Sequence, residues 1–194
     1  MRTFEEHLQA AVDVHGHLCA GQVLGVRMAR RGCLELGLDP DERAAHRRLI
    51  VYIEIDRCSA DAVASVTGCK LGRRTLKYVD YCKVAATFVD TQTGNAVRVI
   101  ARDDARDKAL AYYEGDCDQH IAQLQAYQVM PDQDLMLVRR VKVDIPPEDS
   151  PGRPLRRVTC RQCGESVSDG REVVVGGRTL CRACASQPYY SILD

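Results

Sequence analysis

The sequence of 194 residues predicts an α+β fold, in which a mainly antiparallel sheet is packed with helices and a small C-terminal domain follows. Three observations predict it. Helical and strand-like segments follow one another in the order α, α, β, α, β, β, α, β. A proline-rich stretch interrupts the chain at residues 146–154, and two Cys-x-x-Cys pairs come after it. We therefore divide the chain into a core domain at 1–145, a linker at 146–154 and a small domain at 155–194.

Two helices are expected at the N-terminus. The first covers residues 4–14, because Thr3 and Glu6 form the pattern of a capping box. The second covers residues 20–36 and ends before a glycine and an Asp-Pro turn. Gly21 and Gly25 are four residues apart on it, so they lie on one helix face. This spacing predicts that another backbone segment approaches the second helix closely.

The other elements of the core domain follow from β-branched runs and turn signals. Residues 49–56 are apolar and β-branched, which predicts a strand with a buried face. The expected elements after it are a helix at 60–66, two strands at 83–90 and 96–102 joined by the turn Thr91-Gln92-Thr93-Gly94-Asn95, a helix over 103–127 with a break near Gly115, and a last strand at 135–145.

Composition excludes several classes of protein. The chain has 27 basic and 27 acidic residues, and this zero formal charge argues against a nucleic-acid or membrane-surface binder. No segment approaches the roughly 20 apolar residues of a membrane helix. The N-terminus lacks the apolar core of a secretion signal, so the expected location is cytoplasmic. The ten cysteines are therefore interpreted as metal ligands or free thiols rather than as a disulfide framework.

The C-terminal pairs predict a zinc ribbon. Cys160 and Cys163 form one pair, Cys181 and Cys184 the other, and 17 residues, 164 to 180, separate them. Four thiolates complete a tetrahedron with no open position, so the zinc is expected to be structural. A segment of about 40 residues is also too small to fold without such a metal. An iron site and two redox dithiols remain alternatives, since iron accepts the same ligands.

A second group of soft ligands lies in His15-Gly16-His17-Leu18-Cys19. Imidazole and thiolate together suit zinc or another transition metal. A thiol at the start of a helix also has its pKa lowered by the helix dipole. The alternative is that the histidines cap a helix and that Cys19 is an ordinary small buried residue.

Other candidate residues lie at the ends of predicted elements, where sites are commonly assembled. Cys58 follows the strand at 49–56, and Asp61 comes three residues later, on the same face of the next helix. Cys69 lies in a loop with a glycine. The cysteines at 33, 82 and 117 have no such neighbours and are expected to be ordinary thiols.

These segments together resemble the FmdE family, whose members accompany formylmethanofuran dehydrogenase. The order and spacing agree from about residue 10 to 100, and the four-cysteine ribbon looks like the one appended in many members. The segments that carry the resemblance are His15-Gly16-His17-Leu18-Cys19-Ala20-Gly21, Glu54-Ile55-Asp56-Arg57-Cys58-Ser59-Ala60-Asp61-Ala62, Thr67-Gly68-Cys69-Lys70-Leu71-Gly72, Asp80-Tyr81-Cys82-Lys83 and Thr93-Gly94-Asn95-Ala96-Val97-Arg98.

The resemblance implies an α+β homodimer with sites near the interface between the two copies. It also implies a molybdenum or tungsten oxidoreductase as a possible partner. Carried over residue by residue, the polar positions of the family are His15, His17, Cys19, Cys58, Asp61, Cys69 and Lys83. The sequence departs from the family pattern at four places, which are Ala20 for proline, Ala64 for glutamine, Arg73-Arg74-Thr75 for Lys-Gly-Asn, and Cys82 for glycine.

Three functions are compatible with this interpretation. In the first, a metal-binding protein holds a core transition metal through His15, His17, Cys19, Cys58 and Cys69, with a second, structural zinc in the ribbon. If that core site is catalytic, Cys58, Asp61 and Lys83 take part. Asp61 is then a general base or orients a ligand, and Lys83 or Arg73 binds an anion. In the second, Cys19 and Cys58 form a reactive thiol pair that serves a molybdenum or tungsten enzyme. In the third, the chain is a non-catalytic accessory protein.

Overall fold

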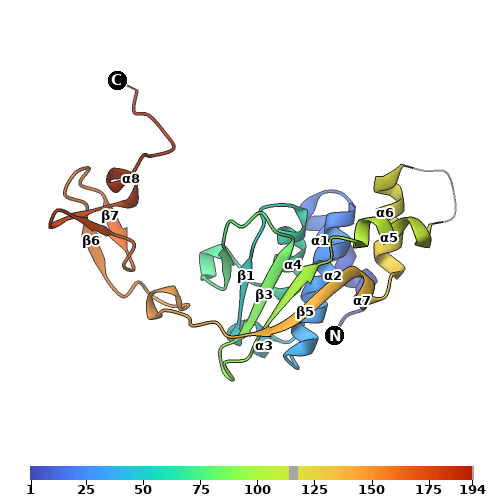
Figure 1. The fold of residues 1–194 in the computed structure, drawn as a ribbon. Helices are drawn as coiled ribbons and strands as arrows, with labels where there is room; N and C mark the ends of the chain where they lie inside the picture. Colours follow the sequence, from blue (N-terminus) through green and yellow to red (C-terminus); the bar gives the residue numbers. More distant parts are fainter. Residues whose placement is uncertain (114–117, 194) are drawn as a thin grey trace. The chain divides into compact units, whose positions relative to one another are not determined.

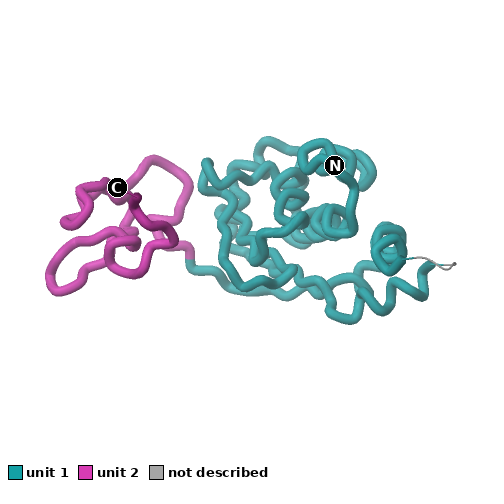
Figure 2. The backbone as a smooth tube through the Cα atoms, turned by 90° about the horizontal axis from the view of Figure 1, so that it is seen from above, with its two compact units in different colours: residues 1–144 teal, residues 145–194 magenta. Residues whose placement is uncertain are grey.

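The computed structural model describes residues 1–113 and 118–193, and these form two compact units, 1–144 and 145–194 (Figure 2). Each unit is described by itself. Among the described residues, no helix has both the length and the apolar character needed to span a membrane.

Unit 1 contains one five-stranded sheet, with the strands in the order β2-β1-β3-β4-β5 (Figure 1). Strand β1 pairs with β2 in parallel, and the other three pairings are antiparallel. This arrangement confirms the predicted α+β class with a mainly antiparallel sheet. The strands are β1 (Leu49–Ile53), β2 (Leu76–Tyr78), β3 (Ala85–Asp90), β4 (Ala96–Ala101) and β5 (Met136–Val141).

Seven α-helices and two short 3-10 helices accompany the sheet in the described part of unit 1. They are α1 (Phe4–His15), α2 (Ala20–Glu35), α3 (Arg43–Arg48), α4 (Cys58–Thr67), η1 (Leu71–Arg73), α5 (Ala105–Ala109), η2 (Leu110–Tyr112), α6 (Gln119–Val129) and α7 (Asp132–Leu135).

Two of these elements were not predicted, and several boundaries differ. Strand β2 has three residues with one buried apolar side chain, Leu76, which is too short for a period to show. Helix α3 is a single polar turn and a half. Strand β1 ends at Ile53 rather than at residue 56, β5 ends at Val141 rather than at 145, and α4 begins at Cys58 rather than at 60. The predicted break near Gly115 lies outside the described residues.

The core of unit 1 lies between one face of the sheet and the helices. Alternate strand residues face the helices, and the register aligns Val51, Phe88 and Val97 in one row across three strands. All three are buried. Helix α2 packs directly on this row, since a Cβ atom at Gly32 would lie 2.3 Å from the Phe88 ring.

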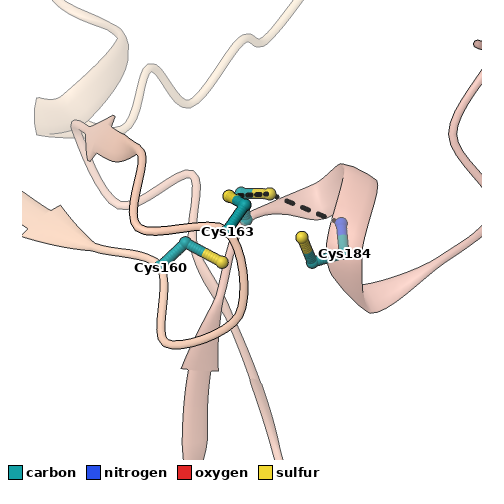
Figure 3. A group of neighbouring side chains, drawn as sticks. Cys160, Cys163 and Cys184 are labelled. Carbon is teal, nitrogen blue, oxygen red and sulfur yellow. Dashed lines mark hydrogen bonds between the residues drawn. The ribbon is translucent and has the colours of Figure 1, made fainter. Parts of the chain in front are cut away.

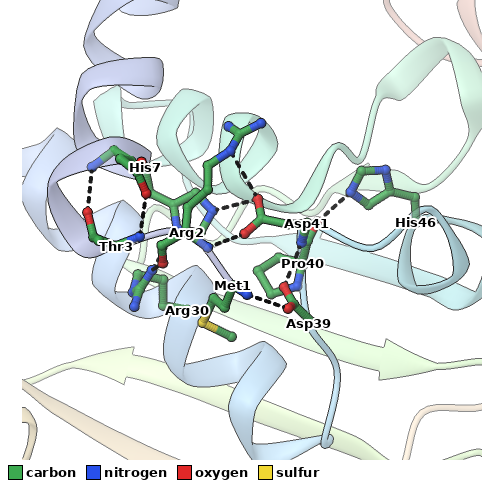
Figure 4. A network of polar contacts seen from close by, with 10 residues as sticks. Met1, Arg2, Thr3, His7, Arg30, Asp39, Pro40, Asp41 and His46 are labelled. Atoms are coloured by element: carbon green, nitrogen blue, oxygen red, sulfur yellow. Dashed lines mark hydrogen bonds and ion pairs between the residues drawn. The ribbon is translucent and has the colours of Figure 1, made fainter.

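A polar network holds the start of α1 against α2 and the loop that follows it (Figure 4). Thr3 and Glu6 form the predicted capping box. The His7 ring is 2% exposed, and its Nδ1 accepts a hydrogen bond from Arg30 at 2.7 Å. Nε2 of His7 therefore carries the hydrogen and donates to Asp41 at 3.1 Å. The network fixes the helix whose far end carries His15.

Asp90, at the end of β3, makes unit 1 sensitive to acid. Its buried carboxylate accepts hydrogen bonds from Arg48 Nε at 2.7 Å, Thr93 Oγ1 at 2.7 Å and the Gln92 amide at 3.1 Å. The Arg48 guanidinium, against the effect of burial and aided by Thr93 and Gln92, lowers the pKa of Asp90 to about 2. A lowered pKa stabilises the folded state above the unfolded value, near 4, and this stabilisation disappears as the pH falls toward 2.

We expect Asp90→Asn to reduce the free energy of unfolding by about 2 kcal/mol at neutral pH. The difference from the wild type should shrink between pH 4 and pH 2, where the wild-type carboxylate takes up its proton. Urea unfolding across this pH range measures it, with the exposed Asp13→Asn as the control. A difference between Asp90→Asn and wild type that is constant over the range would contradict the expectation.

Unit 2 contains two small antiparallel hairpins. Strands β6 (Arg157–Thr159) and β7 (Ser166–Ser168) form one, and β8 (Val173–Val175) and β9 (Arg178–Leu180) form the other. The short helices η3 (Pro147–Asp149) and α8 (Arg182–Ala185) lie before and after them. Gly176 and Gly177 both have positive φ, as the two-residue turn between β8 and β9 requires.

Candidate functional site

The end of α1 and the start of α2 bring three metal-ligand side chains together. Gly16 has a φ of 95° and ends α1 by donating its amide hydrogen to the Val12 carbonyl at 2.7 Å. Cys19 is the N-cap residue of α2. As a result, one donor atom each from His15, His17 and Cys19 lie within 4.8 Å of one another. The group that the sequence indicated is therefore compact in space, and not only in sequence.

His15 is held in one orientation by α4. Its Nδ1 lies 2.9 Å from Oδ2 of Asp61, and its side chain is 14% exposed. The other ring nitrogen, Nε2, is buried and has no hydrogen-bond partner within the part of the chain that the structure describes. A buried polar atom without a partner costs free energy. A ring fixed by a carboxylate on one nitrogen, with the other nitrogen unoccupied, is the arrangement of a metal-ligating histidine.

Cys58 reaches the same place because α2 and α4 approach each other closely. A Cβ atom at Gly21 would lie 2.9 Å from Cys58 Cβ and 3.7 Å from Cys19 Sγ. At Gly25, one turn later, it would lie 2.6 Å from the Ser59 carbonyl oxygen. The close approach that this glycine pair predicted is thus confirmed.

The Cys58 thiol lies beside Cys19 but outside the three-atom group. Burial raises the pKa of Cys58, and the hydrogen bond with the Cys19 thiol adds to this effect. Gln22 is fully buried and donates from Nε2 to the Cys58 carbonyl at 2.6 Å, so it fixes the first turn of α4. Sequence reasoning missed Gln22. The available signal was a glutamine within the apolar stripe of α2.

The structure does not bring Cys69 to this group. Its thiol is 2% exposed and donates to the Leu49 carbonyl at 3.7 Å, within the hydrophobic core. Burial raises the pKa of Cys69, and it raises that of Cys33 to about 12. Cys82 is exposed, with a φ of 51°. The residue at 117 lies outside the described part of the chain.

Two cavities flank the cluster. The larger, about 1090 Å³, is lined by Cys58, Cys82 and Lys83 among others. The smaller, about 500 Å³, is lined by His15, Cys58 and Asp61 with mostly apolar neighbours. Lys83 is thus near the group through a shared cavity, whereas Arg73 lines neither.

The four cysteines of unit 2 form the second group, and their thiol sulfurs lie within 4.8 Å of one another (Figure 3). Cys163 and Cys181 sulfurs are 3.9 Å apart, and the Cys184 amide donates to the Cys181 sulfur at 3.4 Å. Gly164, with a φ of 77°, makes the tight turn after the first pair. These are the two turns of a zinc ribbon.

Backbone amides in this group face the sulfurs, as the turn predicted. The amides of Cys163 and Cys181 lower the pKa of the Cys160 thiol to about 6. Crowding has the opposite effect on Cys184, whose pKa its neighbours, Cys181 first, raise to about 12. One thiolate is therefore stabilised by the backbone, while the others need a cation among them.

Comparisons with known proteins agree with this division. A family model described as "FmdE, Molybdenum formylmethanofuran dehydrogenase operon" matches residues 14–136. A model described as "Prokaryotic dksA/traR C4-type zinc finger" matches residues 153–190.

One curated relative and one solved structure are similar to the chain. A "Probable S-adenosyl-L-methionine-binding protein" of Archaeoglobus fulgidus is 37% identical over 93 residues, which are 47% of this chain. The match spans only 25% of that relative. An FmdE-like protein of tungsten formylmethanofuran dehydrogenase, from Syntrophus aciditrophicus, has a TM-score of 0.63 at 20% identity, over 98% of this chain and 96% of that one. The latter similarity shows the fold.

Proposed function

The chain belongs to the FmdE family, and we propose that it is a metal-binding protein with two distinct centres. The core centre holds zinc or another borderline transition metal through His15, His17 and Cys19. The ribbon holds a structural zinc through Cys160, Cys163, Cys181 and Cys184. One observation carries the core centre, which is the buried, unpartnered Nε2 of a His15 ring that Asp61 orients from the other side, among the residues that the structure describes.

The donor set of the core centre fits such a metal. Two imidazoles and a thiolate are the ligands that zinc and its neighbours prefer. Cys58 lies beside Cys19 and is the candidate for a fourth ligand. With three ligands only, an open position would remain, and the metal would then activate a bound oxygen. Asp61 acts in this proposal by orienting His15, since its Oδ2 is already engaged at 2.9 Å.

A second candidate function rests on the two neighbouring thiols of Cys19 and Cys58. In this alternative the pair is a thiol or redox centre of an accessory protein that serves a molybdenum or tungsten oxidoreductase. The resemblance to the FmdE component of such an enzyme motivates this partner and a homodimer. Fast alkylation of one of these thiols at neutral pH in the metal-loaded protein would favour the thiol function over the metal function.

Elemental analysis of the purified full chain tests the metal proposal. We expect two metal ions per chain in the wild type and one in Cys19→Ser. Asp61→Asn should keep both ions but weaken the core affinity by about 10–100-fold, because it leaves the His15 ring less firmly oriented. The exposed thiol variant Cys82→Ser should keep two ions at wild-type affinity. One ion in the wild type, or two in Cys19→Ser, would contradict the proposal.

A further inference from the structure

The larger cavity of unit 1 has a charge pattern that the metal centre does not explain. Its wall comes from the starts of α2 and α4, the segment before β3, the ends of β4 and β5, and helices α5 and α6. Three carboxylates line it, at 103, 104 and 107. Six cationic side chains line it, which are those of Arg57, Lys83, Arg98, Arg102, Arg106 and Arg139.

Two of these cations are already neutralised. Arg98 Nε donates to Glu54 at 2.6 Å, and Arg102 Nε donates to Asp104 at 2.8 Å. The other four cations make no ion pair with any described residue. They outnumber the two remaining lining carboxylates, at 103 and 107. The free charge of the cavity is therefore positive, although the chain as a whole has no net charge.

The position of Arg139 makes this excess costly unless an anion is bound. The register of β4 and β5 places Arg139 directly opposite Arg98, so two guanidinium groups lie side by side on one face of the sheet. Like charges in opposed positions destabilise a sheet. Glu54 balances Arg98 alone. An anion between Arg139 and Lys83 would balance the remaining charge.

The rest of the lining suits an organic molecule rather than a free ion. Gln123 is 6% exposed and lines the cavity, yet its side chain makes no hydrogen bond with any described residue, which leaves an amide available for a ligand. Leu24, Ile100 and Leu137 supply apolar surface. A volume of about 1090 Å³ is at the upper end of the range for small-molecule sites.

We propose that this cavity binds an organic phosphate of coenzyme size. Its phosphate contacts Lys83 and Arg139, its apolar part lies along Leu24 and Leu137, and its other end approaches Cys58. Arginine and lysine together suit a dianionic phosphate better than a single carboxylate. The inference deepens the proposed function, because the end near Cys58 lies beside the core metal centre, but the phosphate contacts do not require the metal.

Binding of a fluorescent organic anion, 8-anilinonaphthalene-1-sulfonate, tests this in the metal-loaded full chain. We expect one saturable site per chain. Lys83→Gln and Arg139→Gln should each raise its Kd at least fivefold. Arg140→Gln is the matched control, because Arg140 is adjacent on β5, equally exposed, and on the opposite face of the strand. It should change the Kd less than twofold.

Competition identifies the anion. At constant ionic strength, inorganic phosphate should displace the dye and acetate should not. Equal weakening by Arg139→Gln and Arg140→Gln, or equal displacement by phosphate and acetate, would overturn the inference. Metal content measured on the same samples separates the two proposals: dye binding that depends on Lys83 and Arg139 in a chain with one metal ion would refute the core metal centre alone.

Discussion

Replacing Cys181 with serine should unfold residues 145–194 while unit 1 stays folded. Unit 2 has almost no core of its own, because among its described residues only Cys160 and Leu180 are buried apolar side chains. At about 25 cal/mol per Å² of buried apolar surface, two side chains cannot offset the ordering of some 50 residues. The free energy of unit 2 must therefore come mainly from the metal. Structural zinc supplies on the order of 10 kcal/mol in domains of this kind.

The expected result is visible residue by residue in a proton–nitrogen correlation spectrum. In Cys181→Ser the amide signals of residues 145–193 should collapse to unfolded positions, and those of the sheet of unit 1 should not move. A chelator should have the same effect on the wild-type unit 2. Cys82→Ser is the control, since it removes an exposed thiol from the other unit. Dispersed signals for β6 to β9 in Cys181→Ser would show that the hairpins fold without zinc.

The sequence predicted the parts of the fold and the sites that local patterns encode. The capping box of Thr3 and Glu6, the two Cys-x-x-Cys turns, and the glycine pair of α2 each have a direct local cause, and each is present as predicted. Strand β2 could not be found in this way, because it depends on a parallel pairing with β1 and has only one buried apolar residue.

The candidate site was predicted in the same partial way. The group of His15, His17 and Cys19 is local in sequence, so its spacing was informative. The contact of His15 with Asp61 joins residues 46 positions apart and depends on how α1 packs on α4. Cys69 has the residue type of a ligand, but its loop turns the thiol into the core. Spacing cannot show the direction of a side chain after a turn.

Gly25→Ala should both destabilise unit 1 and weaken the core metal centre. A Cβ atom at this position would lie 2.6 Å from the Ser59 carbonyl oxygen and 2.7 Å from Ala62 Cβ. The first contact is with backbone, so no side-chain rotation relieves it, and α4 must move away from α2. Overpacking of this kind costs about 1–3 kcal/mol.

The movement of α4 matters for function because this helix carries both Cys58 and Asp61. Asp61 fixes the His15 ring, and Cys58 lies beside Cys19, so a shift of the helix loosens the centre on two sides. We expect a lower midpoint of urea unfolding and a core metal affinity at least about tenfold below that of the wild type. Gly72→Ala is the matched control, since a Cβ there meets nothing within 4 Å.

The two measurements on Gly25→Ala separate packing from ligation. If stability falls but metal affinity does not, then α4 adjusts without moving its first turn, and the three residues before α4 hold the metal unaided. If both fall together, the close approach of α2 and α4 is itself a condition for the site. The second outcome is the one that the geometry favours, because Gly25 is only one turn from Gly21, whose own Cβ would lie 2.9 Å from that of Cys58.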